Sequence, residues 1–144
     1  MNDFTFQMLL HCNYINDKND IDQLHVEHLV DDNWQKLDLN ISSLGFDIFM
    51  YAILNCQHMY FRNNAAEYGL VLDSSEGFIT VIADKHRSIE TLNVEFKGKL
   101  KKGEATKDMV DSISARMALC PVSINLKNIP NNHITASFEP AWSK

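Results

Sequence analysis

The chain has 144 residues, a length that fits one globular domain over residues 1–144. Apolar residues make up 45% of the chain, enough to build a core, which excludes intrinsic disorder as the main state. Thirteen Lys and Arg against nineteen Asp and Glu give a net charge of −6, which argues against a nucleic-acid partner because a phosphate backbone would be repelled.

The first forty residues predict a meander of three antiparallel strands. Apolar and polar residues alternate over Phe4–Cys12, Leu24–Val30 and Leu37–Ile41. The segments between them, Asn16–Asp20 and Asp31–Asn33, consist of residues that favour tight turns.

A helix is predicted after this meander, and either Ser42 or Ser43 can cap it. From Phe46 to Phe61 the apolar residues cover more than half of the helix circumference, which is typical of a helix enclosed on most sides. Asn63-Asn64, followed by Gly69, indicates its end. We therefore expect a central, largely buried helix.

Strand patterns return at 70–72, 77–83 and 89–100. Thr106 is predicted to cap an amphipathic helix that ends before Pro121. A short helical piece up to Leu126 and a strand over His133–Phe138 complete the order βββ-α-βββ-α-β. Antiparallel strands separated by long helices predict an α+β fold.

Targeting signals are not found in the sequence. The start Met1-Asn2-Asp3-Phe4 lacks the basic region of a signal peptide. The most apolar segment, 44–61, is interrupted by polar residues, whereas a membrane span needs about 20 mainly apolar residues. Three cysteines are an odd and sparse set for a disulfide-held secreted scaffold. We expect a cytoplasmic protein without a membrane partner.

Each cysteine has a structural and a chemical interpretation. Cys56 has apolar neighbours one helical turn away, which favours a buried packing residue. Cys120 precedes Pro121 at the expected start of a helix, where free backbone N–H groups stabilise a thiolate, although it also shares an apolar helix face with Met117. Cys12 continues the apolar face of a strand and is expected in the core.

The sequence gives little support for a metal or cofactor site. On a strand, the spacing of His25 and His28 sends their side chains to opposite faces, which argues against a shared metal ion. His58 lies about 200° around the helix from Cys56, so we expect a solvent-facing or interface histidine instead of a general base. The sequence contains no Gly-rich phosphate loop and no nucleophile elbow, and we expect no cofactor.

In combination, these features resemble the OsmC and organic hydroperoxide resistance family, as a divergent OsmC-like member. The resemblance covers nearly the whole chain, from the strand meander through the cysteine-bearing helix to the final strand. Its most specific parts are the segment Met117–Ser123, which contains Cys-Pro-Val, and the spacing of 120 − 56 = 64 residues between Cys56 and Cys120.

The resemblance implies a fold, an assembly and an activity. The fold would consist of antiparallel sheets wrapped around a buried central helix, in an intertwined homodimer with its sites at the subunit interface. The activity would be a thiol-dependent reduction of small organic hydroperoxides. Cys56 would be the nucleophile, Cys120 would resolve the sulfenic acid as a disulfide, and an external dithiol would act as reductant.

The sequence departs from the pattern of the family's peroxidases. They carry an Arg on an N-terminal strand, but no Arg precedes Arg62 here. They also carry a Glu ten residues before the first cysteine, a position that Phe46 occupies. Asp47 is the nearest carboxylate, yet nine positions at about 100° each turn it half a circle away from Cys56.

These departures leave three interpretations open. Cys56 can be activated from elsewhere, by the partner chain or by one of Lys18, Lys36 and Arg87. A non-catalytic dimer can bind a hydrophobic small molecule in an interfacial pocket, lined in part by Phe46, Phe49, Met50 and Tyr60. The cysteines can also serve as a redox sensor without turnover.

Overall fold

The N-terminal third of the chain forms three sequential antiparallel strands. In the computed structural model, which describes residues 4–140, β1 (Phe4–Ile15) pairs with β2 (Asp20–Val30), and β2 pairs with β3 (Asn33–Lys36). Asp31 and Asp32 both adopt positive φ, 51° and 65°, as the two-residue turn of a β-hairpin requires. The predicted meander is therefore present.

The third strand lies earlier than predicted. No residue of its expected range, Leu37–Ile41, belongs to a strand, because the two-residue turn returns the chain to pairing at Asn33 and the strand ends at Lys36. The Leu37 N–H still donates to the Val26 carbonyl of β2 at 2.9 Å. Leu37 still packs against the core as a half-buried residue, whereas Ile41 is fully exposed. The alternation over 37–41 thus reflects partial burial without a strand.

The long helix α1 (Gly45–Glu67) follows a loop after β3. Neither predicted serine caps it: the residue before the helix is Leu44, and Ser43 Oγ instead accepts a hydrogen bond from the N–H of Asn40 at 2.9 Å. The helix also continues through the predicted end at Asn63-Asn64. It stops just before Gly69, whose φ of 77° suits a residue without a side chain.

The second half of the chain adds three strands and two shorter helical segments. The segments predicted separately at 70–72 and 77–83 form one continuous strand, β4 (Val71–Ala83), which pairs antiparallel with β5 (Ile89–Lys102). The helix α2 (Lys107–Met117) is capped as predicted, because Thr106 Oγ1 accepts the N–H of Met109 at 3.2 Å. The remaining elements are the 3₁₀ helix η1 (Ser123–Leu126) and the strand β6 (Asn131–Glu139).

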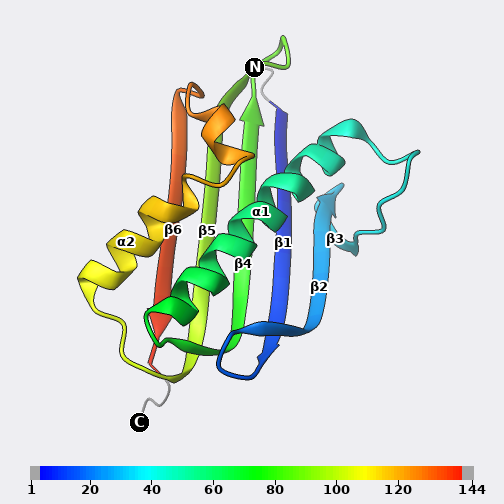
Figure 1. Ribbon diagram of the computed structural model, residues 1–144. Helices are drawn as coiled ribbons and strands as arrows, with labels where there is room; N and C mark the ends of the chain where they lie inside the picture. The colour runs from blue at the N-terminus through cyan, green and yellow to red at the C-terminus, as the bar shows by residue number, and fades with distance from the viewer. Residues whose placement is uncertain (1–3, 141–144) are drawn as a thin grey trace.

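All six strands belong to one sheet in the order β3-β2-β1-β4-β5-β6. The last pair, β5 and β6, is parallel, because the chain returns through α2 and η1 before it pairs again. The expected α+β fold is confirmed, with one mixed sheet in place of separate antiparallel groups. Figure 1 shows α1 and α2 lying across the same face of this sheet.

The core lies between the sheet and the helices, and α1 is covered on one side. Ile53, Leu54 and Phe61 face the sheet and are fully buried. On the opposite side of α1, Ile48 and Met59 keep 42% and 45% of their surface exposed. Within a single chain the helix is therefore not enclosed.

No helix among residues 4–140 is long and apolar enough to cross a membrane.

Asn19 fastens the turn between β1 and β2 to the far end of α1. Its buried side-chain amide donates to the carbonyls of Arg62 and Leu70 at 3.1 and 3.0 Å, and its Oδ1 accepts the N–H of Leu72 at 2.8 Å. These hydrogen bonds join the turn between β1 and β2 to α1 at Arg62 and to the start of β4.

Candidate functional site

Cys56 lies at mid-length on α1 and opens onto a groove of about 570 Å³. Its side chain is half-buried. The groove runs between α1 and the segment that follows α2, and its lining is mostly apolar: Tyr51, Ala52, Asn55, Cys56, Met59, Tyr60, Pro121 and Val122. A small apolar molecule in this groove would therefore reach the Cys56 sulfur.

Cys120 lies in the turn between α2 and η1 and is fully buried. The helix before it ends at Met117, three residues earlier than the cysteine. The N–H of Ser123 donates to Cys120 Sγ at 3.3 Å, and the Cys120 carbonyl accepts the N–H of Ile124 at 2.9 Å. The sulfur therefore faces a backbone N–H as predicted, but the helix begins at Ser123, with Val122 as its N-cap, and not at Pro121.

The two cysteines are free thiols that lie close together. Burial, and after it the neighbouring Cys120 thiol, raises the pKa of the Cys56 thiol to about 11, partly opposed by the backbone N–H of Val122. No cation of the described residues contributes to that pKa. Cys56 is therefore reachable and next to a second sulfur, but protonated at neutral pH.

The three cations predicted as activators lie elsewhere. Lys18 is exposed in the turn between β1 and β2, and Lys36 is exposed at the end of β3. The guanidinium of Arg87 lies 3.7 Å from the centroid of the Phe4 ring, in the turn between β4 and β5. None of them acts on Cys56 within one chain.

Gln57 ties the Cys120 turn to α1, a role that the sequence did not indicate. Its buried Nε2 donates to the Met117 carbonyl at 3.0 Å and to Ser123 Oγ, and it lies 3.6 Å from Cys120 Sγ. Its Oε1 is buried without a partner among residues 4–140. The only sequence signal is one amide in an apolar stretch of helix.

His58 points to the other side of α1 and is buried, so the prediction of a solvent-facing or interface histidine is wrong. Tyr14 Oη lies 2.7 Å from His58 Nε2 and 2.5 Å from Ser75 Oγ, and the imidazole stacks on Phe96 with 5.7 Å between ring centroids. Burial, followed by the charge of Arg62, lowers the pKa of His58 to about 3. The imidazole is therefore neutral and held in place by the sheet.

Other predicted side chains lie where the spacing placed them. Asp47 Oδ2 lies 3.4 Å from His28 Nδ1 on β2, which confirms that Asp47 faces away from Cys56. His25 points to the opposite face of the sheet, where its Nε2 lies 2.6 Å from Glu27 Oε2. Cys12 is fully buried in the core, as predicted. Among residues 4–140, no group of three or more side chains could hold a metal ion.

The four residues predicted to line an interfacial hydrophobic pocket do not share one cavity within the single chain. Only Tyr60 lines the Cys56 groove. Phe46 and Phe49 line a separate hollow of about 300 Å³ beside Arg87, and Met50 is buried in the core. The physical reason is distance, because ten residues of helix separate Phe46 from Cys56 by about 15 Å along the axis.

No protein-family model and no curated protein matches the sequence. The fold, however, is similar to solved structures. An OsmC-like protein from Mycoplasma pneumoniae superposes with a TM-score of 0.53 and 9% identity over 90% of this chain and 94% of that one. An OsmC-like hydroperoxide resistance protein from Jannaschia sp. CCS1 gives a TM-score of 0.59 and 9% identity over 86% and 87% of the two chains.

A third similar structure is a putative osmotic stress induced and detoxification response protein from Psychrobacter arcticus 273-4, with a TM-score of 0.51 and 11% identity. It covers 81% of this chain and 87% of its own. At such low identity, the three structures establish the fold alone. The chain has an OsmC-like fold, which confirms at the level of architecture the resemblance found in the sequence.

Proposed function

We propose that the chain is a cytoplasmic, thiol-dependent peroxidase that reduces small organic hydroperoxides. The observation that carries the proposal is Cys56, which is open to a largely apolar groove and lies close to Cys120. An accessible sulfur beside a buried one is the arrangement that a nucleophile and its resolving partner need. The OsmC-like fold, and the hydroperoxide resistance named for one of its neighbours, support the same activity.

The proposed chemistry runs in three steps. The Cys56 thiolate attacks the outer oxygen of the hydroperoxide, the O–O bond breaks, and the alkoxide takes up a proton and leaves as an alcohol. The Cys120 sulfur then attacks the Cys56 sulfenic acid, which releases water and forms a disulfide. An external dithiol reduces this disulfide and is itself oxidised to a disulfide.

The raised pKa of Cys56 sets the rate that we expect. At a pKa of about 11, roughly one Cys56 in 10⁴ is a thiolate at pH 7. The thiolate, not the thiol, attacks the peroxide. We therefore propose an enzyme that is slow at neutral pH and faster as the pH rises.

We also propose that the chain is a homodimer through its helix-covered face. Several large apolar side chains remain exposed on α1 and on the segment after α2: Ile48 at 42%, Met59 at 45%, Leu119 at 59% and Ile124 at 42%. Met59 also lines the Cys56 groove, so a second copy on this face would deepen the groove. Burial of these side chains would supply the hydrophobic free energy of association.

A second candidate is a binding module for a hydrophobic small molecule. The same raised pKa of Cys56 favours it, since a protonated thiol in a groove of about 570 Å³ acts as an apolar lining. In this case the Cys56 groove would hold a ligand without reacting with it.

Thiol titration before and after one equivalent of cumene hydroperoxide, at pH 7 and pH 9.5, separates the candidates. The peroxidase loses two thiols per chain, faster at pH 9.5, and an added dithiol restores them with turnover. Cys56→Ser loses none, Cys120→Ser stops at a sulfenic acid that dimedone traps, and Cys12→Ala behaves as the wild type. Unchanged thiols at both pH values would contradict the peroxidase and favour the binding module. Oxidation without sustained turnover would favour a redox sensor.

A further inference from the structure

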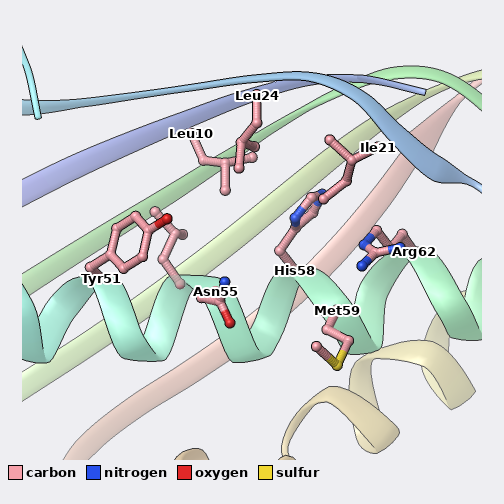
Figure 2. A pocket seen from close by; sticks show the side chains of 9 residues that line it. Leu10, Ile21, Leu24, Tyr51, Asn55, His58, Met59 and Arg62 are labelled. Atoms are coloured by element: carbon pink, nitrogen blue, oxygen red, sulfur yellow. The ribbon is translucent and has the colours of Figure 1, made fainter. Parts of the chain in front are cut away.

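Two histidines lie side by side on the face of the sheet opposite to the helices. His11 on β1 and His25 on β2 are directly paired in the antiparallel register. Figure 2 shows Leu10 and Leu24, the residues just before them, between these strands and α1. Because successive side chains of a strand point to alternate faces, both histidines point away from α1. About half of each imidazole side chain is exposed there.

The two imidazoles share one pocket on this face. Its volume is about 390 Å³, and its lining is polar except at one leucine: His11, Asn13, Gln23, Leu24 and His25. Side chains directly opposite each other on paired strands have Cβ atoms about 4.5–5.5 Å apart. Asn13 and Gln23 form another such pair, two residues along the strands, so their amides flank the imidazoles. Two imidazoles at this spacing can bind a single metal ion.

A carboxylate lies beside one ring nitrogen of each histidine. His25 Nε2 lies 2.6 Å from Glu27 Oε2, and His11 Nδ1 lies 3.9 Å from Glu76 Oε2. The other ring nitrogens, His11 Nε2 and His25 Nδ1, have no hydrogen-bond partner within residues 4–140. A histidine that binds a metal ion usually has its second ring nitrogen against a carboxylate, which fixes the tautomer and strengthens the ligand. One nitrogen of each ring is therefore available to a metal ion.

The donor set selects the class of metal. Imidazole nitrogens bind ions such as Ni²⁺, Cu²⁺ and Zn²⁺, whereas Mg²⁺ and Ca²⁺ require oxygen ligands. No group of three or more side chains among residues 4–140 could hold a metal ion, so two imidazoles would bind it and water would complete the coordination. Glu27 and Glu76 add negative charge, which favours a divalent cation over an anion.

We propose that His11 and His25 together bind one divalent transition metal ion on the face of the sheet opposite to the helices. Each imidazole supplies one nitrogen, and the carboxylates of Glu27 and Glu76 orient the two rings. The site goes beyond the proposed peroxidase and is independent of it, because Cys56 lies on α1, on the other side of the sheet.

The experiment titrates the full chain with Ni²⁺, which does not oxidise thiols, and follows the heat of binding and the broadening of each histidine ring signal in NMR spectra. The wild type is expected to bind one Ni²⁺ per chain, with the signals of His11 and His25 broadened first. His11→Ala and His25→Ala should each weaken binding by about tenfold or more, because a single imidazole remains. Glu27→Gln, which keeps both ligands, should weaken it by about tenfold.

Two matched controls accompany these variants. His86→Ala removes an exposed histidine in the turn between β4 and β5, and Cys56→Ser removes the accessible sulfur. Both should bind Ni²⁺ as the wild type does, and an excess of Mg²⁺ should not displace it. Because His11 and His25 are half exposed, their variants should fold, and thermal unfolding verifies this.

Several results would overturn the proposal. They are the absence of saturable binding by the wild type and an unchanged affinity in His11→Ala or His25→Ala. Loss of binding in Cys56→Ser would assign the metal to the sulfurs, and equal broadening of His86 and His11 would indicate non-specific contact. Either result also contradicts the proposed site. Failure of the peroxidase proposal alters none of these measurements.

Discussion

Two groups of polar side chains lie on opposite sides of the middle of α1, and they differ in how many of their hydrogen-bonding atoms have partners. On the side of α2, Gln57 holds the Cys120 turn, its Oε1 has no partner among residues 4–140, and Cys56 opens onto a wide groove. On the side of the sheet, Tyr14 joins His58 to Ser75 in a sealed chain of hydrogen bonds. Neighbouring residues of one helix thus have opposite environments.

The difference separates accessible from sealed side chains. Cys56 is reachable and lies next to a second sulfur, whereas His58 is buried to 97% and its imidazole is stacked on Phe96. The two-residue spacing turns His58 about 200° around the helix from Cys56, which already argues against a role as its general base. Here its position against the sheet removes it from the chemistry and makes it part of the core.

The largest effect is expected for the pH dependence of Cys56. With a pKa of about 11, its rate of alkylation by iodoacetamide should rise about tenfold per pH unit from pH 7 to pH 10. Cys120→Ala removes a sulfur that raises this pKa, so the variant should react faster at pH 8. Peptide-resolved mass spectrometry measures both rates. A rate that levels off below pH 8 would mean that the pKa of Cys56 is lower than about 11. A cation would then stabilise the Cys56 thiolate.

The next largest effect is expected on the unfolding free energy at acid pH, because His58 is buried in its neutral form. The pKa of His58 is lowered from 6.5 to about 3, so between these values the unfolded chain binds a proton that the native protein does not. Stability should therefore fall as the pH drops from 6.5 towards 3, by an amount on the order of 5 kcal/mol at most.

Urea unfolding at several pH values measures this loss, and His58→Gln should flatten the decline. His86→Gln, at an exposed histidine in the turn between β4 and β5, is the matched control and should leave the decline unchanged. An equally steep decline in His58→Gln would mean that other groups cause the acid sensitivity.

A smaller effect is expected when the side-chain amide of Gln57, which holds the Cys120 turn, is removed. Gln57→Leu leaves Ser123 and the Met117 carbonyl without their donor, which should cost about 1–3 kcal/mol of unfolding free energy. The variant should also form the Cys56–Cys120 disulfide more slowly, because the turn that holds Cys120 is loosened. Gln35→Leu on the exposed strand β3 is the control. Unaltered stability and unaltered disulfide formation would show that packing alone positions Cys120.

Part of the site could be predicted from the sequence and part could not. Periodicity located α1, and Pro121 marked the turn that contains Cys120, so both cysteines were placed on the right elements. The same periodicity treated His58 as a solvent-facing or interface position and gave no role to Gln57. It also grouped Phe46 with Tyr60, although their fourteen-residue separation puts them almost four turns apart.

By itself the sequence determined the alternation of strands and helices, the α+β class, the cap at Thr106 and the burial of Cys12, because each depends on residues close together in the chain. Only the tertiary structure decided which flank of α1 would be open to a groove and which would be sealed against the sheet. The contacts responsible join residues far apart, such as Tyr14 with His58 over 44 positions and Gln57 with Ser123 over 66. Local propensity cannot encode such contacts, since they exist only once the helices have packed on the sheet.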